Sequence, residues 1–188
     1  MEKKELFKIM IDPGHGGKDP GALGKFSVEK NLNLIFANIL FNKLSNDEWF
    51  LPLMTRLSDQ YITLADRVAM AVGEDVHAFI SIHCNASTSE KPNDCQIYYH
   101  DEEKDKPLAE ILFKYVDKID YDTSKWSREI QANFYVLRKL KNYPIPAILI
   151  EIGFLTNKKD EEMLNDPDFQ EKFSEGLYNG LKNYFNKL

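Results

Sequence analysis

Short apolar runs alternate along the chain with stretches whose apolar residues recur every three or four positions, and this alternation leaves few folds open. The short runs predict buried strands, and the recurrence predicts helices with one buried face. We expect strands at residues 6–10, 51–55, 78–82, 95–100, 134–137 and 147–150, and helices at 28–44, 64–72, 107–119, shortly before 165 and from 167 to 188. This series predicts an α/β fold, with a mostly parallel, twisted sheet of about six strands and helices on both of its faces. We expect Ser27 to cap the first helix and Thr63 the second.

Length and composition limit the class of protein. The 188 residues suit one domain, residues 1–188, and the 43% that are hydrophobic exclude a disordered chain. No apolar run is long enough to cross a membrane, and a net charge of −6 gives no footprint for nucleic acid. The first residues lack the apolar segment of a secretory leader, so we expect either cytosolic synthesis or a leader that has been removed. Cys84 and Cys95 are too few for a disulfide framework, and we expect both to be small core residues.

A glycine-rich stretch follows the first predicted strand. Residues 11–24, IDPGHGGKDPGALG, hold five glycines around His15. Glycines allow positive φ and close approach of the backbone, so such a loop can present a histidine at the mouth of a cleft. A turn with an incidental histidine is the plainer interpretation. A phosphate-binding loop fits poorly, because the stretch contains neither a Gly-Lys-Ser/Thr nor a GxGxxG motif.

Ionisable residues stand at the ends of two further predicted strands. His83 follows the strand at 78–82, Glu151 follows the strand at 147–150, and Glu29 lies in the first turn of the helix after the glycine-rich loop. Each alone has a plainer explanation, such as an acid that complements a helix dipole. In an open α/β sheet, however, the carboxyl ends of the strands form the ligand-binding edge. We therefore predict that these three residues and His15 converge on one site.

Three polar residues are expected to support this site from its edge. Arg56 and Arg67 are predicted to form, with Asp59, a structural ion-pair group at the edge of the site. Asn85 closely follows His83 and is expected at the rim.

Two histidines and a carboxylate match an open catalytic zinc site, in which three protein ligands leave a fourth position for water. The remaining carboxylate can serve as the base, so the pattern predicts hydrolysis of an amide with one zinc ion. Cobalt or manganese could occupy the same ligands. A thiol enzyme based on Cys84 is a weaker alternative, because adjacent residues of a strand point to opposite faces.

The stretches DPGHGGKDPGALG, TRLSD, SIHCNAS and PAILIEIGFLTNKKD, with Glu29 at a helix start, resemble the zinc-dependent N-acetylmuramoyl-L-alanine amidases of bacterial cell-wall turnover over nearly the whole chain. The resemblance implies that His15, Glu29 and His83 hold one Zn²⁺, that Glu151 is the general acid/base, and that a water on the zinc is the nucleophile. It also implies that the bond cleaved joins the lactyl group of N-acetylmuramic acid to L-alanine of the peptidoglycan stem peptide. We then expect a monomer that acts on peptidoglycan in the cell envelope or outside the cell, with cytosolic synthesis and release by lysis as the alternative.

Two other functions remain open at this point. A zinc peptidase acting on stem peptides would use the same four residues, and a wall-binding module without activity is the alternative from another class. Two departures from the family pattern are Cys84, where alanine is usual, and Asp94 with Cys95, where glycine is common. In members held inactive by an inhibitory helix, that helix precedes the segment equivalent to 134–137. Residues 120–133 look too short for such a helix, so we expect a site that is open without an activator.

Overall fold

The fold is built on one six-stranded sheet. The computed structural model describes residues 6–117, 119 and 128–186. The strands, in chain order, are β1 (Phe7–Pro13), β2 (Phe50–Met54), β3 (Ala78–Asn85), β4 (Gln96–Tyr99), β5 (Arg128–Gln131) and β6 (Ala147–Phe154). Their order across the sheet is β2-β1-β3-β6-β4-β5, and only the β4–β6 pair is antiparallel among these strands. The predicted α/β class with a mostly parallel sheet is confirmed.

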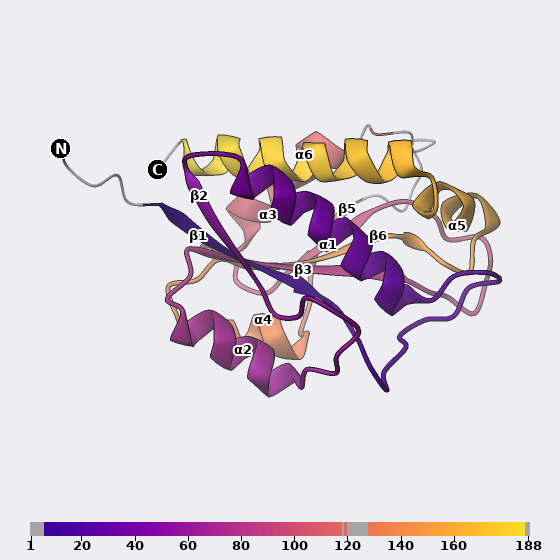
Figure 1. The fold of residues 1–188 in the computed structure, drawn as a ribbon, viewed down its shortest axis with the longest axis horizontal. Helices are drawn as coiled ribbons and strands as arrows, with labels where there is room; N and C mark the ends of the chain where they lie inside the picture. The colour runs from indigo at the N-terminus through magenta and orange to yellow at the C-terminus, as the bar shows by residue number, and fades with distance from the viewer. Residues whose placement is uncertain (1–5, 118, 120–127, 187–188) are drawn as a thin grey trace.

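Helices cover both faces of the sheet, as predicted (Figure 1). The helices are α1 (Glu29–Ser45), α2 (Leu64–Gly73), α3 (Lys106–Val116), α4 (Tyr135–Leu140), α5 (Lys158–Leu164) and α6 (Pro167–Phe185). Figure 1 shows α1, α3 and α6 on one face and α2 and α4 on the other. None of the helices in the described ranges combines the length and the apolar character that a membrane span requires.

Side chains that point to alternate faces of the sheet divide the core into two layers. On β3, Ile80 and Ile82 pack into the cluster under α1, α3 and α6, whereas Phe79 packs into the cluster under α2 and α4. On β6, Ile150 and Leu149 divide in the same way. Because successive side chains of a strand point to opposite faces, the polar residues that continue the second set face α2 and α4. These residues are Asp12 on β1, Ser81 and His83 on β3, and Glu151 on β6.

The prediction of a strand at 134–137 was wrong, and the strand β5 was missed. Val136, Leu137 and Leu140 are buried on one side of α4, so these residues follow the helical period. A run of four apolar residues fits either period, and packing against the sheet decides between them. Residues 120–127, on which the expectation of an open site partly rests, lie outside the described residues.

Two predicted details of the helix and strand ends also differ. Ser27 does not cap α1, whose N-cap is Val28 without a side-chain hydrogen bond; instead the Ser27 backbone N–H donates to Glu161 of α5. Thr63 caps α2 as predicted, accepting from the backbone N–H of Asp66. β6 continues three residues beyond Glu151, so this glutamate lies within its strand rather than after it.

Candidate metal centre and catalytic cleft

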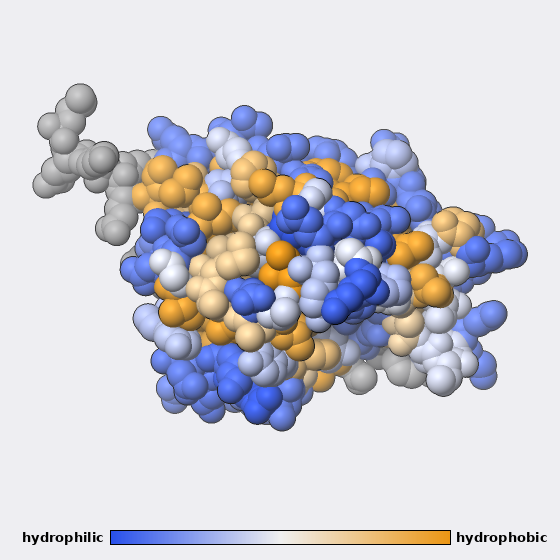
Figure 2. Space-filling view, turned by 60° about the horizontal axis from the view of Figure 1, so that its bottom comes forward, coloured by the Kyte–Doolittle hydropathy of each residue, from blue (hydrophilic) through white to orange (hydrophobic). Residues whose placement is uncertain are grey.

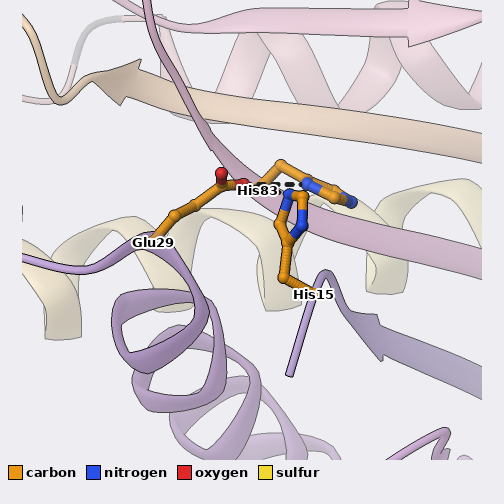
Figure 3. A group of neighbouring side chains, drawn as sticks. All are labelled: His15, Glu29 and His83. Carbon is orange, nitrogen blue, oxygen red and sulfur yellow. Dashed lines mark hydrogen bonds and ion pairs between the residues drawn. The ribbon is translucent and has the colours of Figure 1, made fainter. Parts of the chain in front are cut away.

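Three of the predicted residues meet at the carboxyl edge of the sheet. His15 follows β1, Glu29 is the first residue of α1, and His83 lies near the end of β3; their side chains point toward one another (Figure 3). Glu29 Oε1 lies 3.1 Å from His15 Nε2 and 2.9 Å from His83 Nδ1. One possible ligand atom from each residue lies within 4.8 Å of the other two. The predicted convergence of these three residues is therefore observed.

The loop that carries His15 has an unusual backbone. His15, Gly16 and Gly17 have φ values of 60°, 128° and 56°, in the region that favours glycine. Arg67 donates to the His15 carbonyl at 2.8 Å, and Arg56 donates to the carbonyls of the two preceding residues, Pro13 and Gly14, at 2.9 Å each. These hydrogen bonds hold the loop in a conformation that an L-residue such as His15 rarely adopts.

The two arginines therefore support the site, but not through the ion pairs that we predicted. Arg67 pairs with the buried carboxylate of Asp12, whereas Arg56 donates to backbone carbonyls. Asp59 pairs instead with Lys30, 2.7 Å away, and accepts from the Gly17 backbone N–H. Arg56, Arg67 and Asp59 therefore all form hydrogen bonds with the backbone of the glycine-rich loop.

Asp19, which we did not single out from the sequence, contacts the ring of His15. Its Oδ2 lies 2.9 Å from His15 Nδ1, on the opposite side of the ring from Nε2. Paired backbone hydrogen bonds between Gly16 and Asp19 close the loop that brings them together. Burial opposes ionisation, but the hydrogen bond with His15 holds the pKa of the Asp19 carboxyl below its usual value. A carboxylate at Nδ1 favours a proton on that nitrogen, so Nε2, which faces Glu29, is the ring nitrogen suited to bind a metal.

Glu29 is buried and ionised. Burial would raise its pKa, but the hydrogen bonds with His15 and His83 outweigh that effect and hold the pKa far below the usual range. Its second oxygen, Oε2, accepts from the backbone N–H of Ala22 at 2.7 Å. The backbone of residue 21 passes so close to Glu29 that this position requires glycine, because a Cβ there would lie 2.4 Å from Glu29 Oε2.

Glu151 lies next to His83 in the sheet, and the pKa of its carboxyl is shifted in the opposite direction to that of Glu29. The two residues are paired in the register of β3 and β6. Oε2 of Glu151 is buried and has no hydrogen-bond partner among the described residues. Burial and the charge of Glu29 raise the pKa of Glu151 well above its usual range. A buried carboxyl group with a raised pKa is suited to general acid/base catalysis.

These residues line a cleft of about 380 Å³ between α2 and α4. One wall, from the start of α2 and the loop before it, consists of Tyr61, Ile62 and Leu64; the other, from the start of α4, consists of Phe134, Tyr135 and Val136. We call these the α2 wall and the α4 wall. Figure 2 shows the face of the molecule that α2 and α4 form, where apolar residues gather between hydrophilic ones.

The remaining predictions concern the residues after His83. Asn85 lines the cleft and donates to Gln96 Oε1 at 3.1 Å, which agrees with its expected place at the rim. Cys84 is fully buried in the opposite core layer, and burial raises the pKa of its thiol well above the usual value. Both cysteines are free and buried, as predicted. A buried, protonated thiol makes a thiol enzyme a poor interpretation.

Comparisons with known proteins agree on one family. The model of the N-acetylmuramoyl-L-alanine amidase family matches residues 9–183. The chain is 38% identical over 180 residues to the probable cell wall amidase LytH of Staphylococcus epidermidis and 33% identical over 181 residues to the N-acetylmuramoyl-L-alanine amidase LytC of Bacillus subtilis. Each alignment covers 94% of this chain but only 58% of LytH and 35% of LytC.

Solved structures show the same fold over almost the whole chain. The catalytic domain of the amidase CwlV from Bacillus (Paenibacillus) polymyxa superposes with a TM-score of 0.90 at 32% identity, covering 96% of this chain and 99% of that one. An N-acetylmuramoyl-L-alanine amidase from Clostridium difficile gives a TM-score of 0.88 at 33% identity, with 96% and 97% coverage.

Proposed function

This chain belongs to the N-acetylmuramoyl-L-alanine amidase family of hydrolases, and from that premise we propose that it cleaves the amide between the lactyl group of N-acetylmuramic acid and L-alanine of the peptidoglycan stem peptide. The observation that carries the proposal is the position of Glu151, whose buried and unpartnered carboxyl oxygen lies beside the cluster of His15, Glu29 and His83. The name of the LytH relative refers to a cell wall amidase, so we propose the cell wall as the site of action. Action as a monomer stays a prediction.

The cluster fits a single zinc ion. Two imidazole nitrogens and one ionised carboxylate oxygen are the donor set of an open catalytic zinc site. Glu29 Oε1 lies 3.1 Å from His15 Nε2 and 2.9 Å from His83 Nδ1, and this proximity of the three ligand atoms supports the assignment. When bound, Zn²⁺ would lower the pKa of a water molecule and polarise the substrate carbonyl.

The chain's own residues then supply binding and proton transfer. Glu151 accepts a proton from the attacking water and delivers it to the amine nitrogen as the amide C–N bond breaks, so the proton count balances. Ala22 and Cys84 fix Glu29 by donating backbone N–H groups to its two oxygens, at 2.7 and 3.2 Å. The apolar walls of the cleft limit the access of bulk water to the reacting groups.

The test compares wild type with Glu151→Gln, which keeps the shape of the side chain and removes the transferable proton. We expect the variant to fold and to bind zinc as wild type does, and to release soluble products from purified peptidoglycan at least about 100-fold more slowly. Glu162→Gln is the matched control, because Glu162 is more than half exposed on α5 and faces a lysine rather than the cleft.

The products separate the alternatives. A free stem peptide with L-alanine at its amino terminus indicates an amidase, whereas cleavage within the stem peptide indicates a peptidase. Tight binding to peptidoglycan without any product indicates a wall-binding module. Unchanged activity of Glu151→Gln would contradict the role proposed for this residue.

A further inference from the structure

His15, His83 and Glu151 lie in this order along the carboxyl edge of the sheet. His15 follows β1, His83 lies on β3 and Glu151 lies on β6, and these three strands are consecutive in the sheet. Neighbouring strands lie about 4.8 Å apart. Glu151 therefore lies beyond the possible metal ligands, on the side toward β4.

The α4 wall lies on the same side as Glu151. The ring of Phe134 contacts the ring of Tyr98 edge to face, with 5.0 Å between the ring centroids and 84° between the planes. Tyr98 belongs to β4, the strand next to β6, and packs with the core layer that faces α2 and α4. Its strand partner is Leu149, two residues before Glu151. Phe134 and the possible metal ligands therefore lie on opposite sides of Glu151.

The α2 wall lies on the other side, beside the His15 loop. Tyr61 packs on Gly17, where a Cβ would lie 2.8 Å from the Tyr61 backbone nitrogen and 3.1 Å from its Cβ. The ammonium group of Lys18 lies 4.5 Å from the centre of the Tyr61 ring. Arg67 of α2 also donates to the His15 carbonyl. The metal ligands and Glu151 therefore lie between the two walls.

The chemistry of amide hydrolysis determines which end of the substrate lies on the Glu151 side of the cleft. The group that protonates the leaving amine must be within hydrogen-bonding distance of the amide nitrogen. The substituent on that nitrogen then extends past Glu151, and the acyl group extends the other way, past the ligands. We propose that the L-alanine end of the stem peptide binds against the α4 wall and that the lactyl-muramoyl group binds against the α2 wall. This inference rests on the proposed amidase function.

The exposure of the two aromatic residues agrees with this assignment. Phe134 is 38% exposed and Val136 beside it is buried, so the α4 wall offers an apolar surface suited to a small methyl side chain. Tyr61 is 44% exposed and combines an apolar ring with a polar hydroxyl, a surface suited to a sugar.

The experiment measures kcat/KM for two pairs of synthetic muramoyl peptides. The first pair carries L-alanine or glycine at the first position of the stem, and the second pair carries muramic acid alone or the disaccharide. In Phe134→Ala, we expect the preference for L-alanine over glycine to fall about 10-fold, which is the lower end of the range for loss of one methyl contact. The preference for the disaccharide should stay unchanged in this variant. In Tyr61→Ala, we expect the disaccharide preference to fall and the alanine preference to stay.

Two further variants test whether the expected changes come from a folding defect or from the loss of any exposed aromatic ring. Phe134→Leu keeps an apolar wall and should retain most of the alanine preference, which guards against a folding defect in Phe134→Ala. Tyr143→Ala removes an aromatic ring that is 40% exposed and does not line the cleft, so both preferences should stay unchanged. The reverse pattern, or no change of either preference in Phe134→Ala and Tyr61→Ala, would overturn the proposal. Failure of wild type to cleave any of the four substrates would instead contradict the amidase function.

Discussion

At the scale of single residues, the contact between Asp19 and His15 leads to a prediction about the proposed metal site. A carboxylate that accepts from Nδ1–H fixes both the tautomer and the orientation of a histidine that binds metal through Nε2. We expect Asp19→Ala to weaken zinc binding about 10- to 100-fold, measured by competition with a chromophoric chelator. The ¹⁵N spectrum of His15 should show a loss of the Nδ1–H tautomer in the same variant.

The control for this prediction is Asp59→Ala. Asp59 also holds the glycine-rich loop, through the Gly17 backbone N–H and Lys30, but it does not contact the imidazole of His15. The tautomer should persist in this variant. If both variants lose zinc affinity equally and the tautomer is unchanged, Asp19 acts through the order of the loop and the prediction is wrong.

Gly21 is a second residue on which the site depends. Its φ is +67°, and a Cβ would lie 2.4 Å from Glu29 Oε2 and 2.7 Å from the His15 ring. We expect Gly21→Ala to displace one of these ligands and to lower the free energy of unfolding by about 1–3 kcal/mol. Chelator competition and urea denaturation measure the two effects.

Gly73→Ala gives the opposite expectation with the same change of residue. Gly73 ends α2, and a Cβ there would meet no atom within 4 Å. Alanine should leave zinc binding unchanged and stabilise the fold by up to about 1 kcal/mol, since it restricts the unfolded chain. Equal behaviour of the two variants would show that close packing at position 21 is unimportant.

Sequence reasoning found the residues whose position along a strand or helix determines where they point. His83 and Glu151 continue apolar runs, and Glu29 opens a helix, so the topology of an α/β sheet brings them together. Asp19 could not be found in this way. Its contact with His15 depends on three consecutive positive φ values, and the sequence gives the glycines but not the path of the loop.

At the scale of elements, the same reasoning correctly predicted the strands that are apolar over several residues. β1, β3 and β6 are apolar over several residues and occupy the centre of the sheet. β4 was predicted, whereas β5 was missed: it has four residues and lies at the edge of the sheet, and its pairing with β4 depends on long-range contacts rather than on local pattern. α4 was mistaken for a strand because its six residues are too few for a helical period to be distinct.

Asp160 of α5 makes the packing of that helix against β6 sensitive to pH. Its Oδ2 accepts from the backbone N–H of Phe154 at 2.8 Å and of Asp94 at 3.0 Å. Burial nevertheless raises its pKa from 3.8 to about 6. Between those values the folded protein holds a proton that the unfolded chain has released, so the contribution of Asp160 to stability is full below about pH 4 and is lost as the pH rises through 6.

We therefore expect Asp160→Asn to flatten the dependence of stability on pH. The amide oxygen can still accept from both backbone groups, and the loss of stability between pH 4 and pH 6 should shrink by about 2–3 kcal/mol. Urea denaturation across that range measures it. Glu162→Gln on the exposed side of α5 should leave the slope as it is in wild type; an unchanged slope in Asp160→Asn would show that its carboxyl has an ordinary pKa when folded.

At the scale of the whole molecule, the possible metal ligands connect parts of the chain that are far apart in sequence. His15, Glu29 and His83 come from the end of β1, the start of α1 and the end of β3. The unfolded chain does not hold these groups together, so a metal that they bind favours the folded state. Binding should therefore be visible in the stability of the protein, without any substrate.

We expect zinc to raise the melting temperature of wild type. At a free concentration of about 1,000 times the dissociation constant, the added free energy of unfolding is about 4 kcal/mol, or roughly 8–16 °C for a chain of this size. His83→Ala should abolish the shift, whereas His100→Ala should keep it, because the His100 ring bonds the Ala132 carbonyl rather than the cleft residues. Calorimetry with zinc and with a chelator measures each shift. An equal shift in wild type and His83→Ala would mean that zinc binds elsewhere, and the assignment of the metal centre would then be wrong.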